Sequence, residues 1–168
     1  MRLKTLLVCL AFLLSVSISN FGSGFAGEKA NLSGTWKLDQ DKSHSNGPGF
    51  DQTMTIAHSG EKVKVDAKQK SPRGESSINE EYTLDGREAE FTPPNPPNPP
   101  NTKGKRKASW LANGRGVLVE DEIGEGQTAR RVARKMILSS DGKVLTIDYF
   151  IDDSRGSFEI KRVYNKVS

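Results

Sequence analysis

The sequence predicts an all-β domain, an antiparallel up-and-down β-barrel of about eight to ten strands. Three observations lead to this fold class. Short runs of alternating apolar and polar residues recur roughly every dozen residues, and turn-forming pairs such as Asp85-Gly86 and Asp141-Gly142 separate them. No stretch after Ala26 has a convincing helical period. A sandwich is also compatible with these runs, but the continuous hairpin order favours a barrel, which leaves no open sheet edges.

The first 26 residues have the organisation of a secretory signal peptide. Met1-Arg2-Leu3-Lys4 is basic, residues 6–16 are apolar apart from Cys9 and Ser15, and a region of small residues ends at Gly24-Phe25-Ala26. We therefore expect cleavage after Ala26 and export to the periplasm or beyond the cell. A retained membrane anchor is the alternative, but the apolar run is shorter than the span of about 20 residues that a bilayer requires.

The remaining chain, residues 27–168, has the length of a single domain. Cys9 is the only cysteine, so the processed protein is expected to contain no disulfide and no reactive thiol. Without Arg2 and Lys4 the chain has 23 basic and 21 acidic residues, a net charge of +2. This near balance gives no case for binding nucleic acid or a membrane surface.

The first expected strand is Leu32–Asp39, which alternates strictly and places Trp36 among the residues of one face. Residues 41–50 are polar and contain glycine and proline, so we expect a loop there. Asp85-Gly86 predicts a tight hairpin. The further expected strands are residues 53–58, 62–69, 75–84, 88–91, 105–111, 116–122, 130–138, 144–151 and 158–165.

Residues 93–101 interrupt the strand pattern with the repeat Pro-Pro-Asn. A polyproline II helix has three residues per turn, so Asn95, Asn98 and Asn101 would line one edge of a stiff loop. Proline cannot donate a ladder hydrogen bond, and we therefore expect this loop to lie outside the barrel wall.

The Ser-Gly-Thr-Trp sequence at residues 33–36 resembles the first strand of lipocalin-like (calycin) barrels. The patterns SGTWKLDxxKS and SxDGKxLT also resemble small exported bacterial proteins of this kind whose role is uncharacterised. The resemblance implies that Gly34 and Trp36 form a structural signature at the closed end of the barrel. It also implies that a basic residue of the last strand lies across the Trp, and Arg162 is the candidate, since it shares its face with Phe158, Ile160 and Tyr164.

Several charged residues alternate in register with the expected core, among them Glu80, Asp121 and Arg134. Buried charges are costly unless they are paired. They could form internal salt bridges, or a shift of one residue in register could turn them outward. Alternatively, they orient a small ligand in a water-filled cavity near the open end of the barrel. This cavity would also be lined by Tyr82, Trp110, Met136 and Tyr149.

The sequence contains no recognisable catalytic pattern. The two histidines, His44 and His58, lack the spacing of metal ligands, and no nucleophile motif or phosphate-binding glycine loop occurs. Glu80 and Asp121 could be imagined as an acid–base pair, but no feature places them at a useful distance. We therefore expect no enzyme activity, no metal and no cofactor.

Two functions remain open from the sequence. The first is an exported barrel that binds a small apolar or amphipathic ligand. The second is an envelope or interaction protein with a filled barrel, which binds a protein partner through the Pro-Asn loop and the neighbouring basic stretch, Pro93 to Lys107.

Overall fold

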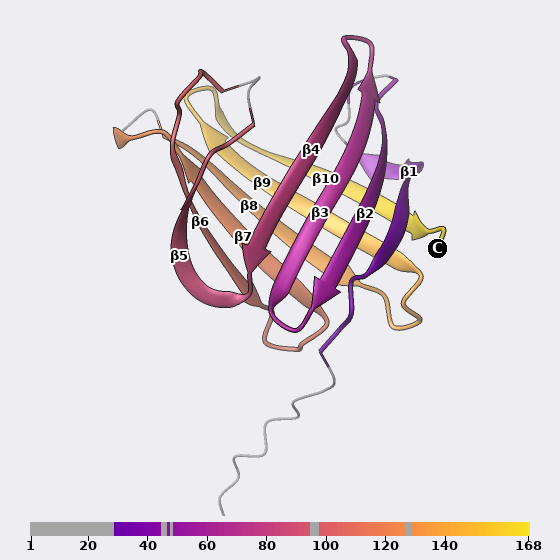
Figure 1. The fold of residues 1–168 in the computed structure, drawn as a ribbon. Helices are drawn as coiled ribbons and strands as arrows, with labels where there is room; N and C mark the ends of the chain where they lie inside the picture. The colour runs from indigo at the N-terminus through magenta and orange to yellow at the C-terminus, as the bar shows by residue number, and fades with distance from the viewer. Residues whose placement is uncertain (1–28, 45–46, 48, 95–97, 127–128) are drawn as a thin grey trace, which may run out of the picture.

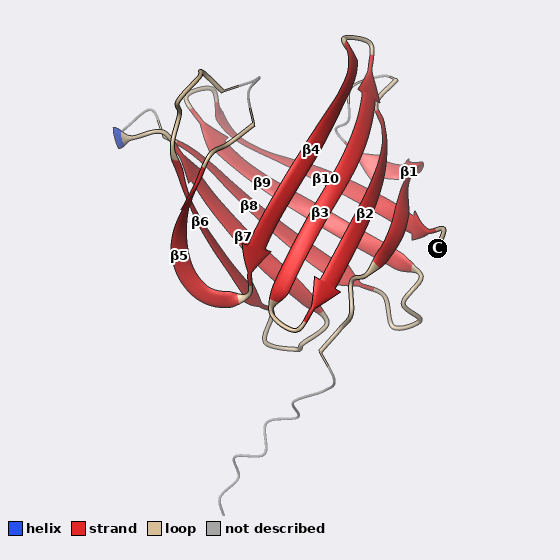
Figure 2. Cartoon of the chain, in the orientation of Figure 1, coloured by secondary structure: helices blue, strands red, loops and turns tan. Residues whose placement is uncertain are grey.

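The computed structural model describes residues 29–44, 47, 49–94, 98–126 and 129–168, and the expected signal peptide lies outside them. Ten antiparallel strands form one sheet that curls into a nearly closed barrel (Figures 1 and 2). In this part of the chain no helix is long and apolar enough to cross a membrane. The strands are β1 (Gly34–His44), β2 (Asp51–Ser59), β3 (Lys62–Ser71), β4 (Gly74–Thr83), β5 (Asp85–Phe91), β6 (Gly104–Trp110), β7 (Gly116–Ile123), β8 (Arg130–Leu138), β9 (Val144–Asp153) and β10 (Gly156–Lys166).

The predicted all-β, up-and-down fold is confirmed, and every expected strand is present. The main difference in bounds is at β1, which continues through residues 41–44, where a loop was expected. The register between β1 and β10 shifts between Asp39 and His44. At this irregularity the Ser43 hydroxyl donates to the Asp39 carbonyl at 2.6 Å and accepts from the Val163 N–H at 3.0 Å. A β-bulge thus allows a polar segment to stay in the wall.

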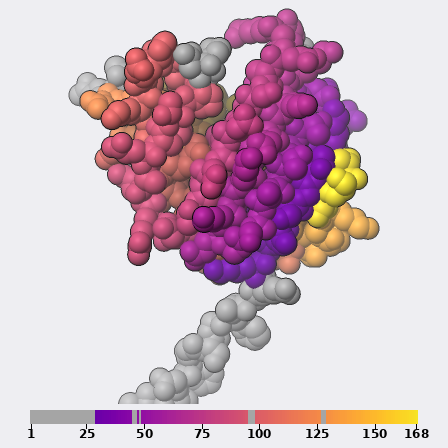
Figure 3. Space-filling view, in the orientation of Figure 1, coloured from indigo at the N-terminus to yellow at the C-terminus, as the bar shows by residue number. Residues whose placement is uncertain are grey.

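The sheet has a seam between β4 and β5. The strand order is β4-β3-β2-β1-β10-β9-β8-β7-β6-β5, so each of these two strands is hydrogen-bonded on one side only. The hairpin predicted at Asp85-Gly86 is therefore wrong, because β4 and β5 follow each other in the chain without forming a ladder. The chain bends at Leu84, whose N–H donates instead to the Glu61 carbonyl at 2.8 Å. Figure 3 shows the molecular surface hollowed between β4 and the β5–β6 side.

One end of the barrel is filled around Trp36, which is fully buried. Its Nε1 donates to the Leu32 carbonyl at 3.0 Å, which ties the segment before β1 to the core. The Nζ of Lys166, in the last strand, lies 5.4 Å from the centre of the Trp36 ring. Gly34 has a φ of 140°, and a Cβ there would lie 2.7 Å from the Ser168 carbonyl oxygen, so this position requires glycine.

The predicted stacking of Arg162 on Trp36 is wrong. The Arg162 guanidinium lies over Phe50 and Tyr149 instead, at 4.3 and 4.9 Å from the ring centres. Lys166 occupies the predicted place because it is the residue that pairs with Trp36 in the β1–β10 register.

The loop between β5 and β6 lies at the opposite, open end of the barrel and outside the ladders (Figure 1). Residues 95–97, including Asn95, are not among those described. Residues 98–102 form a bend and a turn rather than the predicted polyproline II helix. The Thr102 N–H donates to the Pro99 carbonyl at 3.3 Å, and Asn101 has a φ of 63°, which polyproline II excludes.

Candidate functional site

A cavity of about 280 Å³ lies inside the open half of the barrel. Its apolar lining comes from both sides of the barrel, from β2, β3 and β4 and from β8, β9 and β10, because the alternation of these strands turns their small and aliphatic residues inward. The polar wall comes mainly from β6 to β10. The apolar lining includes Met54, Val65, Ala67, Ile78, Met136, Ile147, Ile151 and Ile160, and the polar lining includes Gln52, Gln69, Glu80, Tyr82, Arg106, Asp121, Arg130, Arg134, Tyr149 and Arg162.

Four charged side chains form a connected cluster in the cavity wall. The Arg106 guanidinium donates to both carboxylate oxygens of Asp121, at 2.6 Å from Nε and 2.9 Å from Nη2. The same Nη2 donates to Glu80 Oε1 at 3.2 Å. Arg134 completes the cluster, since it donates to Glu80 Oε2 and, at 2.9 Å, to Asp121 Oδ2. Each carboxylate therefore bridges both arginines.

This cluster is buried, and its charges balance. The side chains of Arg106 and Asp121 are each 6% exposed, and that of Glu80 is 12% exposed. Burial alone would raise the pKa of the Glu80 carboxyl, but the charges of Arg134 and Arg106 outweigh it and hold that pKa below its usual value. The Glu80 carboxyl is thus an ionised partner of the two arginines and does not have the raised pKa of a general acid.

Arg106 was not among the predicted site residues. The basic stretch that contains it, residues 103–107, has the composition of a solvated segment, but the strand alternation divides it. Arg106 points inward together with Gly104 and Ala108, whereas Lys105 and Lys107 are exposed. The sequence did contain a signal for this orientation. Ala108, two residues after Arg106 in β6, is a small apolar residue on the same face of the strand, which indicates that this face points inward.

Of the seven residues predicted to line a cavity, six do so: Glu80, Tyr82, Asp121, Arg134, Met136 and Tyr149. The predicted salt bridges of Arg134 to Glu80 and Asp121 also form. Internal salt bridges and a polar cavity lining were alternative interpretations of these charged residues. Both are present, because the paired residues Glu80, Asp121 and Arg134 also line the cavity. The Tyr82 hydroxyl lies 3.5 Å from the Met136 sulfur, and burial raises the pKa of this phenol to about 12.

Trp110 does not line the cavity and lies near the filled end instead. It ends β6, and its ring centre lies 5.3 Å from that of His58. Lys29 Nζ lies 5.0 Å from the Trp110 ring. Trp110 lies on the inward face of β6 with Arg106 and Ala108, which is why a position in the cavity was predicted. The prediction failed because Trp110 is at the end of β6 that is farther from the cavity.

A second polar group lies across the cavity around Gln52. Its Oε1 accepts from the Tyr164 hydroxyl at 2.5 Å and from Arg162 Nη1 at 3.3 Å. Arg162 also contacts the rings of Phe50 and Tyr149. Burial raises the pKa of the Tyr164 phenol further above its usual value near 10, so this hydroxyl remains a donor in alkaline solution also.

Two buried arginine donors of the cavity wall have no acceptor among the described residues. They are the Nε groups of Arg130 and Arg134. A buried donor without an acceptor costs about 1–3 kcal/mol. The described lining contains four arginines but only two carboxylates. The wall thus offers spare hydrogen-bond donors on cationic groups.

The β5–β6 loop borders the cavity. Pro94 and Asn98 belong to its lining, and Asn98 Nδ2 donates to the Pro94 carbonyl at 2.8 Å. Pro93 is buried against the barrel. The described part of the Pro-Asn segment is therefore at the cavity mouth.

Comparison with known proteins identifies the fold. No protein-family model matches the chain, and no curated protein is similar to it in sequence. Among solved structures, it is similar to the crystal structure of zebrafish ileal bile acid-binding protein complexed with cholic acid, with a TM-score of 0.52 and 14% identity. The match covers 81% of this chain and 98% of the zebrafish chain. At this identity the likeness shows the fold alone, an antiparallel up-and-down β-barrel like that of the zebrafish protein.

Proposed function

We propose that this protein binds a small amphipathic molecule with an anionic group in its interior cavity. The observation that carries the proposal is the pair of buried Nε donors on Arg130 and Arg134 that lack an acceptor among the described residues. An oxyanion of a ligand would satisfy such donors with charge-assisted hydrogen bonds. The aliphatic residues that line the cavity from β2 to β4 and from β8 to β10 would cover the apolar part of the same molecule.

The size and composition of the cavity support a small molecule. A volume of about 280 Å³ lies near the lower limit of ligand pockets, about 300 Å³. The mixture of aliphatic residues with a few convergent polar groups is also typical of such pockets. The zebrafish barrel of the same fold was crystallised with cholic acid, itself an amphipathic acid, which supports the same ligand class here.

The alternative function through Pro93 to Lys107 stays a prediction, because no described contact tests a protein partner. The cavity favours the ligand hypothesis, since a filled barrel was the condition of the alternative. The Pro-Asn loop also has a role under the ligand hypothesis, because Pro94 and Asn98 border the cavity.

We also propose export, on the strength of the N-terminal sequence pattern, and a location in the bacterial envelope, on the resemblance of the SGTWKLDxxKS and SxDGKxLT patterns to exported bacterial proteins. Expression of the full chain in a bacterial host, followed by fractionation and mass measurement, tests this. The expected product is periplasmic or secreted and begins at Gly27. A full-length product retained in the cytoplasm or membrane would contradict export without affecting the ligand hypothesis.

Native mass spectrometry of gently purified protein tests ligand binding directly, since a co-purified small acid would add its mass to the folded barrel. Displacement of a fluorescent anionic amphiphile, anilinonaphthalene sulfonate, measures affinity in parallel. We expect the Arg130→Gln variant to bind the dye roughly tenfold more weakly, because the substitution removes one charge-assisted hydrogen bond to the dye. Arg87→Gln, which removes an exposed arginine of β5, is the matched control.

Equal dye binding by the Arg130→Gln variant and the wild type would contradict the proposed site. Trp110 fluorescence is not a suitable probe, because Trp110 lies outside the cavity. An isoleucine-to-tryptophan change at Ile160, a cavity-lining residue, provides both a steric block and a local reporter. Its near-ultraviolet spectrum and unfolding curve would establish that the barrel is intact.

A further inference from the structure

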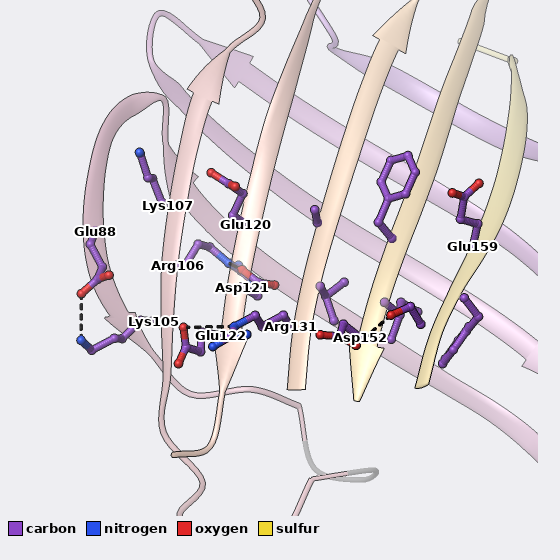
Figure 4. A pocket seen from close by; sticks show the side chains of 16 residues that line it. Glu88, Lys105, Arg106, Lys107, Glu120, Asp121, Glu122, Arg131, Asp152 and Glu159 are labelled. Carbon is purple, nitrogen blue, oxygen red and sulfur yellow. Dashed lines mark hydrogen bonds and ion pairs between the residues drawn. The ribbon is translucent and has the colours of Figure 1, made fainter. Parts of the chain in front are cut away.

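The outer face of the sheet carries a second concave site, a groove of about 600 Å³ over β6 to β10 (Figure 4). We call it the outer groove. Arg106, Asp121, Val132 and Ile151 line both this groove and the interior cavity, but the residues on which the inference rests, Lys107, Glu120, Ala133, Phe150 and Glu159, line the outer groove only. One cross-strand row runs through it, formed by the register pairs Lys107↔Glu120, Glu120↔Ala133, Ala133↔Phe150 and Phe150↔Glu159.

The centre of this row is apolar. Phe150 is 43% exposed, one of three large hydrophobic residues exposed in the described part of the chain. Phe150 pairs with Ala133 of the neighbouring strand β8, and both residues line the outer groove. The small side chain of Ala133 leaves space beside the Phe150 ring. An exposed aromatic ring next to a hollow is typical of a surface that receives a side chain from a partner.

The two ends of the apolar centre are acidic and unpaired. Glu120 and Glu159 flank Ala133 and Phe150, and neither makes an ion pair or side-chain hydrogen bond with any described residue (Figure 4). The other carboxylates have partners: Glu88 pairs with Lys105 at 3.1 Å, and Glu122 pairs with Arg131 at 3.7 Å. Asp152 accepts from the Ser157 hydroxyl at 2.9 Å.

We infer that the outer groove binds an extended basic segment of a partner protein, in which two Lys or Arg residues flank an apolar one. The apolar side chain would lie against Phe150 and Ala133, and the two cations would reach Glu120 and Glu159. The spacing agrees with an extended chain. Glu120 on β7 and Glu159 on β10 are three strand spacings apart, about 14 Å, while four residues of an extended chain span about 13 Å.

Lys107 gives the inference an internal control. It lies across from Glu120 in the β6–β7 register but forms no ion pair with it among the described contacts. Its positive charge would repel a basic partner. Removal of this charge should therefore strengthen binding, whereas removal of the two carboxylates should weaken it.

Titration of the isotopically labelled, folded protein with the peptide Lys-Ser-Phe-Ser-Lys, followed by NMR, tests the inference. We expect saturable shifts at the amides of Ala133 and Phe150, weaker binding at high salt, and no such shifts with Glu-Ser-Phe-Ser-Glu. The Glu120→Gln, Glu159→Gln double variant should bind roughly tenfold more weakly, and Lys107→Gln about threefold more tightly. Glu81→Gln, which removes an exposed carboxylate of β4, should leave the affinity unchanged.

Three results would overturn the inference: no shifts at millimolar peptide, equal binding of the charge-reversed peptide, or equal affinity of the double variant. A Phe150→Ser variant adds a separate measurement, because it removes the apolar contact and retains both carboxylates. Retained affinity in this variant would also overturn the inference. These outcomes do not depend on ligand binding in the cavity, since none of the substituted side chains lines it.

Discussion

Glu80 and Arg106 meet across the seam of the barrel, where Arg106 Nη2 donates to Glu80 Oε1 at 3.2 Å. Glu80 belongs to β4 and Arg106 to β6, and the intervening edge strand β5 forms no ladder with β4. The side chains therefore make a connection that backbone hydrogen bonds do not make here. Asp121 and Arg134 extend this connection to β7 and β8.

Glu80→Gln should destabilise the barrel by about 3 kcal/mol, because it leaves two buried arginines with one carboxylate between them. Urea unfolding followed by circular dichroism measures the change. Glu81→Gln is the matched control, since Glu81 is the next residue and is exposed. Equal stability of the two variants would show that the seam does not depend on this cluster.

Acid should weaken the fold partly through Glu80. The folded-state pKa of this carboxyl lies below its usual value of 4.5, because the charges of Arg134 and Arg106 outweigh burial. Its contribution is therefore complete above about pH 4.5 and is lost as the pH falls through the folded-state pKa. Unfolding free energies measured between pH 6 and pH 3 should fall less steeply for Glu80→Gln than for the wild type. Parallel curves would contradict this assignment.

His58 should make the stability depend on pH in a higher range. Its Nδ1 accepts from the Leu32 N–H at 3.2 Å and its Nε2 lies 3.1 Å from the Gly60 carbonyl, which assigns the neutral Nε2–H tautomer. Burial lowers the pKa of the ring below 6.5. The contribution of neutral His58 is thus complete above about pH 6.5 and decreases as the pH falls towards the folded-state pKa.

Unfolding measured at pH 7.5 and pH 5.5 tests the role of His58. We expect the free energy of unfolding of the wild type and of the His44→Gln variant to fall as the pH is lowered from 7.5 to 5.5. The His58→Gln variant should show a smaller fall over the same range. His44 is a suitable control because it is exposed at the end of β1. A loss that disappears in His44→Gln and remains in His58→Gln would refute the prediction.

Tyr82 should limit the stability in alkali. Burial raises the pKa of this phenol to about 12, whereas an unfolded tyrosine ionises near pH 10. The unfolded chain therefore releases a proton that the folded chain retains, and stability is lost as the pH rises from about 10 to 12. Absorbance at the tyrosinate band should show Tyr82 ionising together with unfolding. Ionisation near pH 10 in the intact fold of a Tyr149→Phe, Tyr164→Phe variant would contradict this.

Gly116→Ala should destabilise the β7–β8 pair by about 1–3 kcal/mol. A Cβ at this position would lie 2.0 Å from the Met136 carbonyl oxygen and 3.1 Å from the Ile137 Cα, so the backbone itself would have to move. Thermal unfolding measures the loss. Gly47→Ala is the control, because a Cβ at Gly47 would meet no atom within 4 Å. A Gly116→Ala protein with unchanged stability would contradict the prediction.

Most of the wall and part of the cavity were predictable because both depend on alternation. A strand turns successive side chains to opposite faces, so the pattern around Glu80, Asp121 and Arg134 indicates that they point inward without knowledge of their neighbours. The same rule applies to Arg106, which was missed because the lysines on either side of it make the segment resemble a solvated patch. Trp110 shows the limit of the rule, since alternation identifies a face but not a position along the barrel axis.

The order of residues is thus sufficient for the all-β class, the ten strands and most of the inward set, because each depends on local periodicity and turn chemistry. Tertiary structure alone decides which inward residues meet. It places Lys166 rather than Arg162 over Trp36, leaves β4 and β5 unpaired at a seam, and brings Glu80 to Arg106. These relationships depend on sheet register and closure, which join residues far apart in the chain and which no local pattern encodes.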